Sequence, residues 1–213
     1  MRRASLIALA ALLATASRAY AFPATPDGRQ AAHDELARFE AGLDAVDSAT
    51  LALGRWCATR RLADPPVIRA INAVAAPPTT PAWVRQALRP DPGEPIAYRH
   101  VRLVCGDRVL SNAENWYRPR RLTAAMNDAL EHTQAPFGAV VKPLGFTRRT
   151  LSVTWLFDPL KAAATAGHAD LAVPEAVLNH RAVLRAADGA AFSAVSETYT
   201  REILGAGPAP TGP

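Results

Sequence analysis

The sequence is poor in residues that bind metals. It has two cysteines among 213 residues, and its five histidines are scattered, so that no two of them stand four residues apart. Structural zinc sites need clustered cysteine and histidine ligands, and a histidine pair on a helix needs that four-residue spacing. We therefore expect no bound metal.

The sequence also lacks a basic tract, and it lacks the interleaved aromatic and basic residues that follow a nucleic-acid backbone. We therefore expect no nucleic-acid partner. The formal net charge is +5, but Arg2, Arg3 and Arg18 lie at the N-terminus, and the charge without these three is +2. A chain with so small a net charge does not imply a strong charge-driven partner.

The N-terminal apolar run, Ser5 to Ser17, has 13 residues, fewer than the about 20 that a helix needs to span a membrane. It follows Arg2 and Arg3 and precedes Ala19-Tyr20-Ala21, which has the A-x-A pattern of a cleavage site. These features predict a signal peptide over residues 1–21, and a periplasmic or secreted mature protein with no stable membrane span. The alternative is an N-terminal membrane anchor.

The two cysteines, Cys57 and Cys105, have two interpretations. An exported chain meets an oxidising compartment, in which they could form a disulfide. They could equally be two small buried apolar side chains. Cys57 lies on the same helical stripe as Leu53 and Trp56, and Cys105 lies on the apolar face of a strand, so both are predicted to point inward.

The length favours one domain with flanking segments. Residues 22–28 form a proline-containing leader and residues 205–213 a tail rich in proline and glycine, and both are predicted to be disordered. The domain is then predicted over residues 29–204.

Periodicity along this domain predicts helices first and strands later. Apolar residues at steps of three and four predict helices, and alternation predicts strands. Helices are expected near 29–46, 49–57, 81–88 and 122–132, and strands near 67–74, 97–105, 108–118, 146–157, 177–185 and 192–203. This order is typical of an α+β fold, an antiparallel sheet with helices packed on one face.

Two of the predicted strands carry a charge on their apolar face. Strand side chains alternate with a period of two, so Arg99 shares a face with Val101 and Leu103, and Glu197 shares a face with Val195 and Tyr199. A charge on the core side of a sheet is costly unless it meets a partner or a ligand. A buried polar pocket is one interpretation, and a structural ion pair between Arg99 and Glu197 is the other.

Five stretches in order resemble the chorismate pyruvate-lyase family. Its wider, chorismate lyase-like superfamily includes the effector-binding domains of some bacterial transcription regulators. The stretches that carry the resemblance, over roughly residues 30–204, are Asp47-Ser48-Ala49-Thr50, Arg99-His100-Val101-Arg102-Leu103, Trp116-Tyr117-Arg118-Pro119, Ala135-Pro136-Phe137-Gly138 and Ser196-Glu197.

The resemblance implies roles for particular residues. Arg99 would hold an aromatic carboxylate, with Arg102 as the alternative, and Glu197 would reach the hydroxyl end of the ring. The backbone N–H of Phe137 would also contact the carboxylate. Ala49 would close over the ligand, in a position where the lyases have a larger methionine. Glu197 and Arg99 are therefore the candidate catalytic residues, and all five are candidates for substrate binding.

The chemistry that the resemblance implies needs no cofactor or metal, because loss of pyruvate from chorismate, an enol ether, gives the aromatic 4-hydroxybenzoate. Arginine suits a carboxylate through bidentate geometry, and a buried glutamate suits proton transfer. A second carboxylate would need another cation, from Arg102, Arg148 or Arg149. The last two residues are also typical of a solvated strand end.

Two functions follow from these observations. The first is an exported lyase acting on chorismate or a related enol-ether carboxylate. The second is a non-catalytic module that binds a small aromatic carboxylate. Chorismate is made in the cytosol, whereas the N-terminus predicts export, and fold alone cannot separate the two functions. His180 is expected to be a polar residue at the surface or a strand edge rather than a catalytic base.

Overall fold

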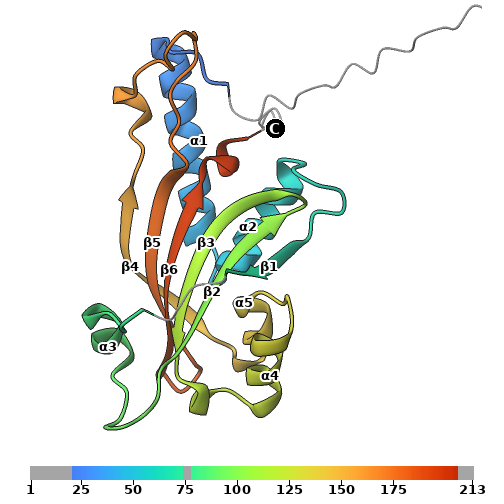
Figure 1. Cartoon of the computed structure of the whole chain (residues 1–213), viewed down its shortest axis with the longest axis vertical. Coiled ribbons are helices and arrows are strands. Elements are labelled where there is room, and N and C mark those ends of the chain that lie inside the picture. Colours follow the sequence, from blue (N-terminus) through green and yellow to red (C-terminus); the bar gives the residue numbers. More distant parts are fainter. Residues whose placement is uncertain (1–20, 74–77, 206–213) are drawn as a thin grey trace, which may run out of the picture.

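The computed structural model describes residues 21–73 and 78–205, and within them it forms one six-stranded antiparallel sheet with helices (Figure 1). The predicted α+β class is confirmed. The helices are α1 (Pro26–Asp44), α2 (Ala49–Thr59), α3 (Ala82–Leu88), α4 (Ala124–His132) and α5 (Phe137–Val140), and short 3₁₀ turns lie at Pro119–Arg121, Lys142–Leu144, Pro159–Lys161 and Arg201–Leu204. The strands are β1 (Ile68–Asn72), β2 (Ala97–Cys105), β3 (Arg108–Tyr117), β4 (Thr147–Trp155), β5 (Ala176–Arg185) and β6 (Ala191–Thr200).

The strands lie in the order β1-β2-β3-β6-β5-β4. Two predicted hairpins, β2–β3 and β5–β6, form through tight turns that contain Gly106 and Gly189, both with positive φ. Glycine adopts this backbone conformation without a steric penalty. The last strand, β6, pairs with β3 as well as with β5. This long-range pairing brings Glu197 opposite Ala113 and thus close to the arginine strand.

One face of the sheet, here called the inner face, carries most of the core. Helices α1 and α2 cover part of it with Phe39 and Trp56, whose rings pack edge-on at 5.1 Å, and Phe39 also contacts Tyr199 of β6. A second apolar cluster on this face joins Tyr117, Phe137 and Phe192. The candidate site lies between these two clusters.

The opposite, outer face is partly covered as well. The short helix α3 packs Val84 and Leu88 against Trp116, Val183 and Ala194. A helix was predicted here, but its position on the outer face differs from the predicted arrangement, in which the helices cover one face only. It stands apart from the other helices in Figure 1.

The first turns of α2 and α4 are capped by the side chain of the residue that precedes each helix. Ser48 caps α2 by accepting a hydrogen bond from the N–H of Leu51, and Thr123 caps α4 by accepting one from the N–H of Met126. Such caps satisfy N–H groups that have no partner within the helix. The cap of α2 matters for the site, because it fixes the direction of residues 47–50.

The segment before α1 differs from the prediction of a disordered leader over residues 22–28. The N–H of Leu171 donates to the carbonyl of Phe22 at 2.8 Å, and the N–H of Ala24 donates to the carbonyl of Ala169 at 2.7 Å. Helix α1 begins at Pro26. Backbone groups that pair in this way order a segment whatever its side chains, and composition alone does not reveal such a partner.

Residues 1–20, 74–77 and 206–213 lie outside the described part. Almost all of the predicted signal peptide and of the predicted disordered tail fall there, so both stay predictions. Among the helices that the structure describes, none is long and apolar enough to cross a membrane.

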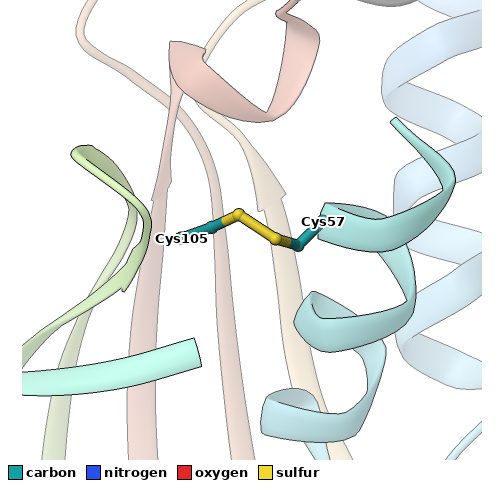
Figure 2. Close-up of a disulfide and its surroundings, with 2 residues drawn as sticks. All are labelled: Cys57 and Cys105. Atoms are coloured by element: carbon teal, nitrogen blue, oxygen red, sulfur yellow. A yellow bond between two sulfur atoms is a disulfide. The ribbon is translucent and has the colours of Figure 1, made fainter. Parts of the chain in front are cut away.

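The two cysteines form a disulfide between the last turn of α2 and the end of β2 (Figure 2). Their Cα atoms are 6.3 Å apart and both side chains are fully buried. Of the two interpretations left open by the sequence, the disulfide is the one observed. It joins the helix that forms one wall of the site to the sheet that forms the floor.

Replacing Cys57 and Cys105 together by alanine should lower the free energy of unfolding. The bond closes a loop with a sequence separation of 48 residues, and the chain-entropy treatment assigns about 4 kcal/mol to a loop of this length. Urea unfolding of the oxidised protein and the double variant measures the difference. A change below about 1 kcal/mol would contradict this prediction.

Candidate functional site

A small cavity lies between the inner face of the sheet and the wall made by α2 and α5. The space open to the centre of a water-sized sphere is about 30 Å³, room for about two water molecules. An aromatic acid is larger, so the wall would have to move for one to enter. The lining residues are Asp47, Ser48, Ala49, Thr50, Val101, Leu103, Ala113, Asn115, Phe137, Gly138, Phe146, Arg148, Leu184, Val195 and Glu197.

The wall is thin where α2 meets α5. A Cβ atom added at Gly138 would lie 2.7 Å from the Oγ of Ser48 and 3.2 Å from the Oγ1 of Thr50. Only glycine permits this close approach without displacing the cap of α2. Outside the wall is an open groove of about 850 Å³, which shares Asp47, Ser48, Thr50, Gly138 and Phe146 with the cavity. Separation of α2 from α5 would therefore join the cavity to the groove.

Glu197 and Arg148 face each other in the cavity. The Nη2 of Arg148 lies 3.5 Å from the Oε2 of Glu197, and the hydroxyl of Tyr199 donates to the same oxygen at 3.0 Å. Both charged side chains are more than 90% buried. Burial raises the pKa of Glu197 above its usual value, although the Arg148 charge and the Tyr199 hydrogen bond act in the opposite direction. Burial also raises the pKa of Tyr199, with a further contribution from the Glu197 charge.

Arg148 is held in place from both sides. Its backbone N–H donates to the Oδ1 of Asp47 at 2.9 Å, and its Nη1 donates to the Oγ1 of Thr150 at 3.2 Å. The Thr150 hydroxyl in turn lies 3.3 Å from the Oδ1 of Asp44. The expectation of a solvated strand end is wrong for Arg148 and holds for Arg149, which is exposed on the outer face.

Arg99 lies on the inner face and is 7% exposed. Its Nη2 donates to the carbonyls of Ala135 at 3.2 Å and Thr133 at 3.4 Å, whereas its Nε and Nη1 have no acceptor among the described residues. An ion pair between Arg99 and Glu197, which was the alternative interpretation of the sequence, is not formed, and Glu197 is paired with Arg148 instead. Arg99 does not line the cavity itself, but its cross-strand neighbour Asn115 does.

Of the other predicted site residues, two line the cavity and one lies on the opposite face of the sheet. Phe137 and Ala49 line the cavity together with Glu197, and their roles there stay predictions. Arg102 is exposed on the outer face of β2. Its placement corrects the alternative that assigned the carboxylate to Arg102, because a side chain on the outer face cannot reach a cavity on the inner face.

His180 is a neighbour of Glu197 outside the cavity lining, and its position differs from the prediction. It is fully buried rather than at the surface or a strand edge, and it stands opposite Glu197 in the β5–β6 pair. Neither ring nitrogen has a hydrogen-bond partner in the described part of the chain. Burial, with a contribution from the nearby Arg148 charge, lowers the pKa of His180 to about 4. The imidazole is therefore neutral at pH 7.

Asn115 is a further residue that the sequence argument missed. It is 4% exposed and lines the cavity beside Val195, its neighbour on β6. The alternation of β3 could have identified Asn115 as inward-facing, because Asn115 shares a face with Ala113 and Tyr117. An amide on an apolar strand face is informative in the same way as a charge.

Replacing His180 by phenylalanine should maintain or raise stability at pH 7, because the change removes two buried nitrogens that lack partners. It should also reduce the dependence of stability on pH. In the wild type, the unfolded chain takes up a proton as the pH falls through about 6.5, whereas folded His180 does so only near 4. Stability should therefore fall between these values by about 3 kcal/mol.

Urea unfolding of both proteins from pH 7.5 to 3.5 tests this, because carboxyl groups common to the two proteins contribute equally. The wild-type curve should fall more steeply than the variant curve between pH 6.5 and 4. Parallel curves would show that His180 is not held neutral in the folded state.

Comparison with known proteins finds one close relative in sequence. The uncharacterized protein y4mC of Sinorhizobium fredii is 43% identical over 192 residues, an alignment that covers 86% of this chain and 81% of that protein. No protein-family model matches the sequence.

Solved structures with a partly similar arrangement include bacterial transcription regulators. They are the possible transcriptional regulator YydK of Bacillus subtilis (TM-score 0.42, 16% identity, 64% of this chain and 59% of that one) and PhnF of Mycobacterium smegmatis (0.44, 15%, 63% and 58%). The effector domain of PhnF solved alone gives 0.43, 14%, 62% and 80%. This chain thus spans about three fifths of each full-length regulator. TM-scores below 0.5 carry no conclusion about what the cavity binds.

Proposed function

This chain belongs to the family of the uncharacterized protein y4mC, and we propose that it is a binding protein for a small organic carboxylate, with its ligand site in the cavity between the sheet and the α2–α5 wall. The preferred ligand class is an aromatic acid. Binding has fewer structural requirements than catalysis, since it needs only a cation, an apolar slot and a wall that can open.

The observation that carries the proposal is the state of Arg99. Its guanidinium is buried, it has no carboxylate partner among the described residues, and two of its nitrogens have no acceptor. A buried cation without a counter-charge is costly. Burial accordingly lowers the pKa of Arg99. A ligand carboxylate would supply the missing charge and accept the unused N–H groups, in the bidentate manner that arginine favours.

The two ends of the site differ in chemistry. At one end Asn115 lines the cavity, and its cross-strand neighbour Arg99 lies outside the lining. Glu197 lies two residues further along the strands, and the guanidinium of Arg148 reaches it from β4. Much of the remaining lining is apolar and includes Val101, Leu103, Ala113, Phe137, Leu184 and Val195. A flat ring with a carboxylate at one end and a hydroxyl at the other matches this order. A hydroxyl could donate to Glu197 or accept from Arg148.

Replacing Arg99 by glutamine should weaken binding of 4-hydroxybenzoate by about 30-fold or more, because the change removes one partner of a desolvated charge pair. Isothermal titration calorimetry of the wild type and the variant, with 4-hydroxybenzoate, benzoate and chorismate as ligands, measures the effect. Benzoate should bind less tightly than 4-hydroxybenzoate, since it lacks the hydroxyl that would form a hydrogen bond with Glu197 or Arg148.

The matched control is Arg102→Gln, which removes the same charge from the same strand but from the outer face. Its affinity should equal that of the wild type. Equal losses in both variants would indicate a general effect of charge. No heat of binding with any of the three ligands at millimolar concentration would contradict the proposal for this ligand class.

A second candidate function is elimination of pyruvate from chorismate or a related enol ether. The observation that favours it is Glu197, whose burial raises its pKa and thereby favours the protonated form that an ether oxygen would need. Elimination of pyruvate is the less favoured function for two reasons. The predicted export separates the chain from cytosolic chorismate, and the disulfide is typical of proteins from oxidising compartments.

Incubation with chorismate followed by chromatography for 4-hydroxybenzoate separates the two functions. A binding protein should release none above the spontaneous rate. If product does form, Glu197→Gln should lower kcat by about 100-fold or more while sparing affinity, because the amide keeps the shape of the side chain and loses its proton. Product formation that does not depend on Glu197 would rule out its proposed role as the acid.

A further inference from the structure

A second cavity, of about 450 Å³, lies on the outer face of the sheet between α3 and strands β4 and β5. Four arginines line it, Arg89, Arg149, Arg181 and Arg185, and Trp83 stands beside them. No aspartate or glutamate is among its lining residues. The cavity is separated from the inner site by the sheet itself, so any ligand here is additional to the one proposed above.

The strand register explains why these arginines converge. Arg149 of β4 pairs with Val183 of β5, and Arg181 and Arg185 are the residues two positions before and after Val183 on the same strand. Side chains two residues apart on a strand share a face, so all three guanidinium groups rise around Val183. Arg89 completes the group from the end of α3, where its backbone is left-handed with φ 45°.

Some arginines in the described part of the chain form ion pairs with carboxylates. Arg118 pairs with Glu94 at 2.6 Å, and Arg108 pairs with Glu202 at 2.8 Å. Within the described residues none of the four cavity arginines forms an ion pair, although Arg185 donates to the carbonyl of Gly189 and Arg181 lies 5.2 Å from the centre of the Trp83 ring. Four like charges around one concave surface repel one another unless an anion lies between them.

We propose that this outer cavity is a binding site for a phosphate or sulfate group. A tetrahedral oxyanion accepts several hydrogen bonds at once, and the planar guanidinium group matches its oxygens in bidentate fashion. The partly buried Trp83 gives the site an apolar side, against which the remainder of a phosphorylated or sulfated molecule packs. The same chemistry is presented by a free phosphate ester and by the headgroup of an anionic lipid.

The decisive variant is the double substitution Arg149→Gln/Arg181→Gln, with Arg69→Gln/Arg102→Gln as its matched control. The control removes two charges from exposed positions of the same face, on the distant strands β1 and β2. Calorimetry with pyrophosphate as the probe, at low and at physiological salt, should give binding to the wild type that the cavity variant weakens by about tenfold or more. The control should change it by less than about twofold.

Co-sedimentation with vesicles distinguishes the source of the phosphate. Binding to phosphatidylglycerol vesicles but not to soluble pyrophosphate, lost in the cavity variant and kept in the control, would assign the site to a lipid headgroup. Binding to pyrophosphate in solution would assign it to a soluble ester. Thermal unfolding of both variants verifies that they fold. If the wild-type protein binds 4-hydroxybenzoate at the inner site, both variants should bind it as well. The proposal would be overturned if the wild-type protein bound neither pyrophosphate nor the vesicles, or if the two variants lost binding equally.

Discussion

The site depends on one constraint, the presence of buried polar groups on a sheet face that is otherwise apolar. Arg99, Asn115, Arg148, His180 and Glu197 all lie on the inner face between two apolar clusters. Apolar side chains of similar size would pack there at a lower cost in desolvation. Arg148 and Glu197 form an ion pair, but Arg99, Arg148 and His180 each keep at least one buried nitrogen that has no hydrogen-bond partner among the described residues. Such groups are expected where a ligand completes the set.

The wall opposite this face is held by features that are themselves local. The disulfide fixes the end of α2 to β2, the Ser48 cap fixes its beginning, and Gly138 allows α5 to approach it closely. The disulfide is a covalent bond, whereas the Ser48 hydrogen bond and the close approach at Gly138 are weak interactions. The beginning of α2 is therefore the part of the wall that can move at low cost, and it is also the part that lines both the cavity and the outer groove.

Much of this arrangement could be predicted from the sequence, because alternation within a strand decides which side chains share a face. It placed Arg99 and Glu197 on the inner face, and together with the helical stripe of Cys57 it predicted that both cysteines point inward, although it left the disulfide open. It could not place Arg148. A bulge at Leu151 interrupts the β4–β5 register, so that Arg148 and Val153 both face inward although an odd number of positions separates them. Nor could it reveal that Glu197 pairs with Arg148 rather than Arg99, since that depends on the distance between strands β4 and β6.

The most direct test of the central claim is a crystal structure of the protein with bound 4-hydroxybenzoate. The account predicts the ring between the sheet and the α2–α5 wall, its carboxylate within hydrogen-bonding distance of Arg99 and its hydroxyl toward Glu197 and Arg148, with α2 and α5 further apart than in the unliganded structure. A carboxylate held by the outer arginines with an unchanged inner cavity would contradict it.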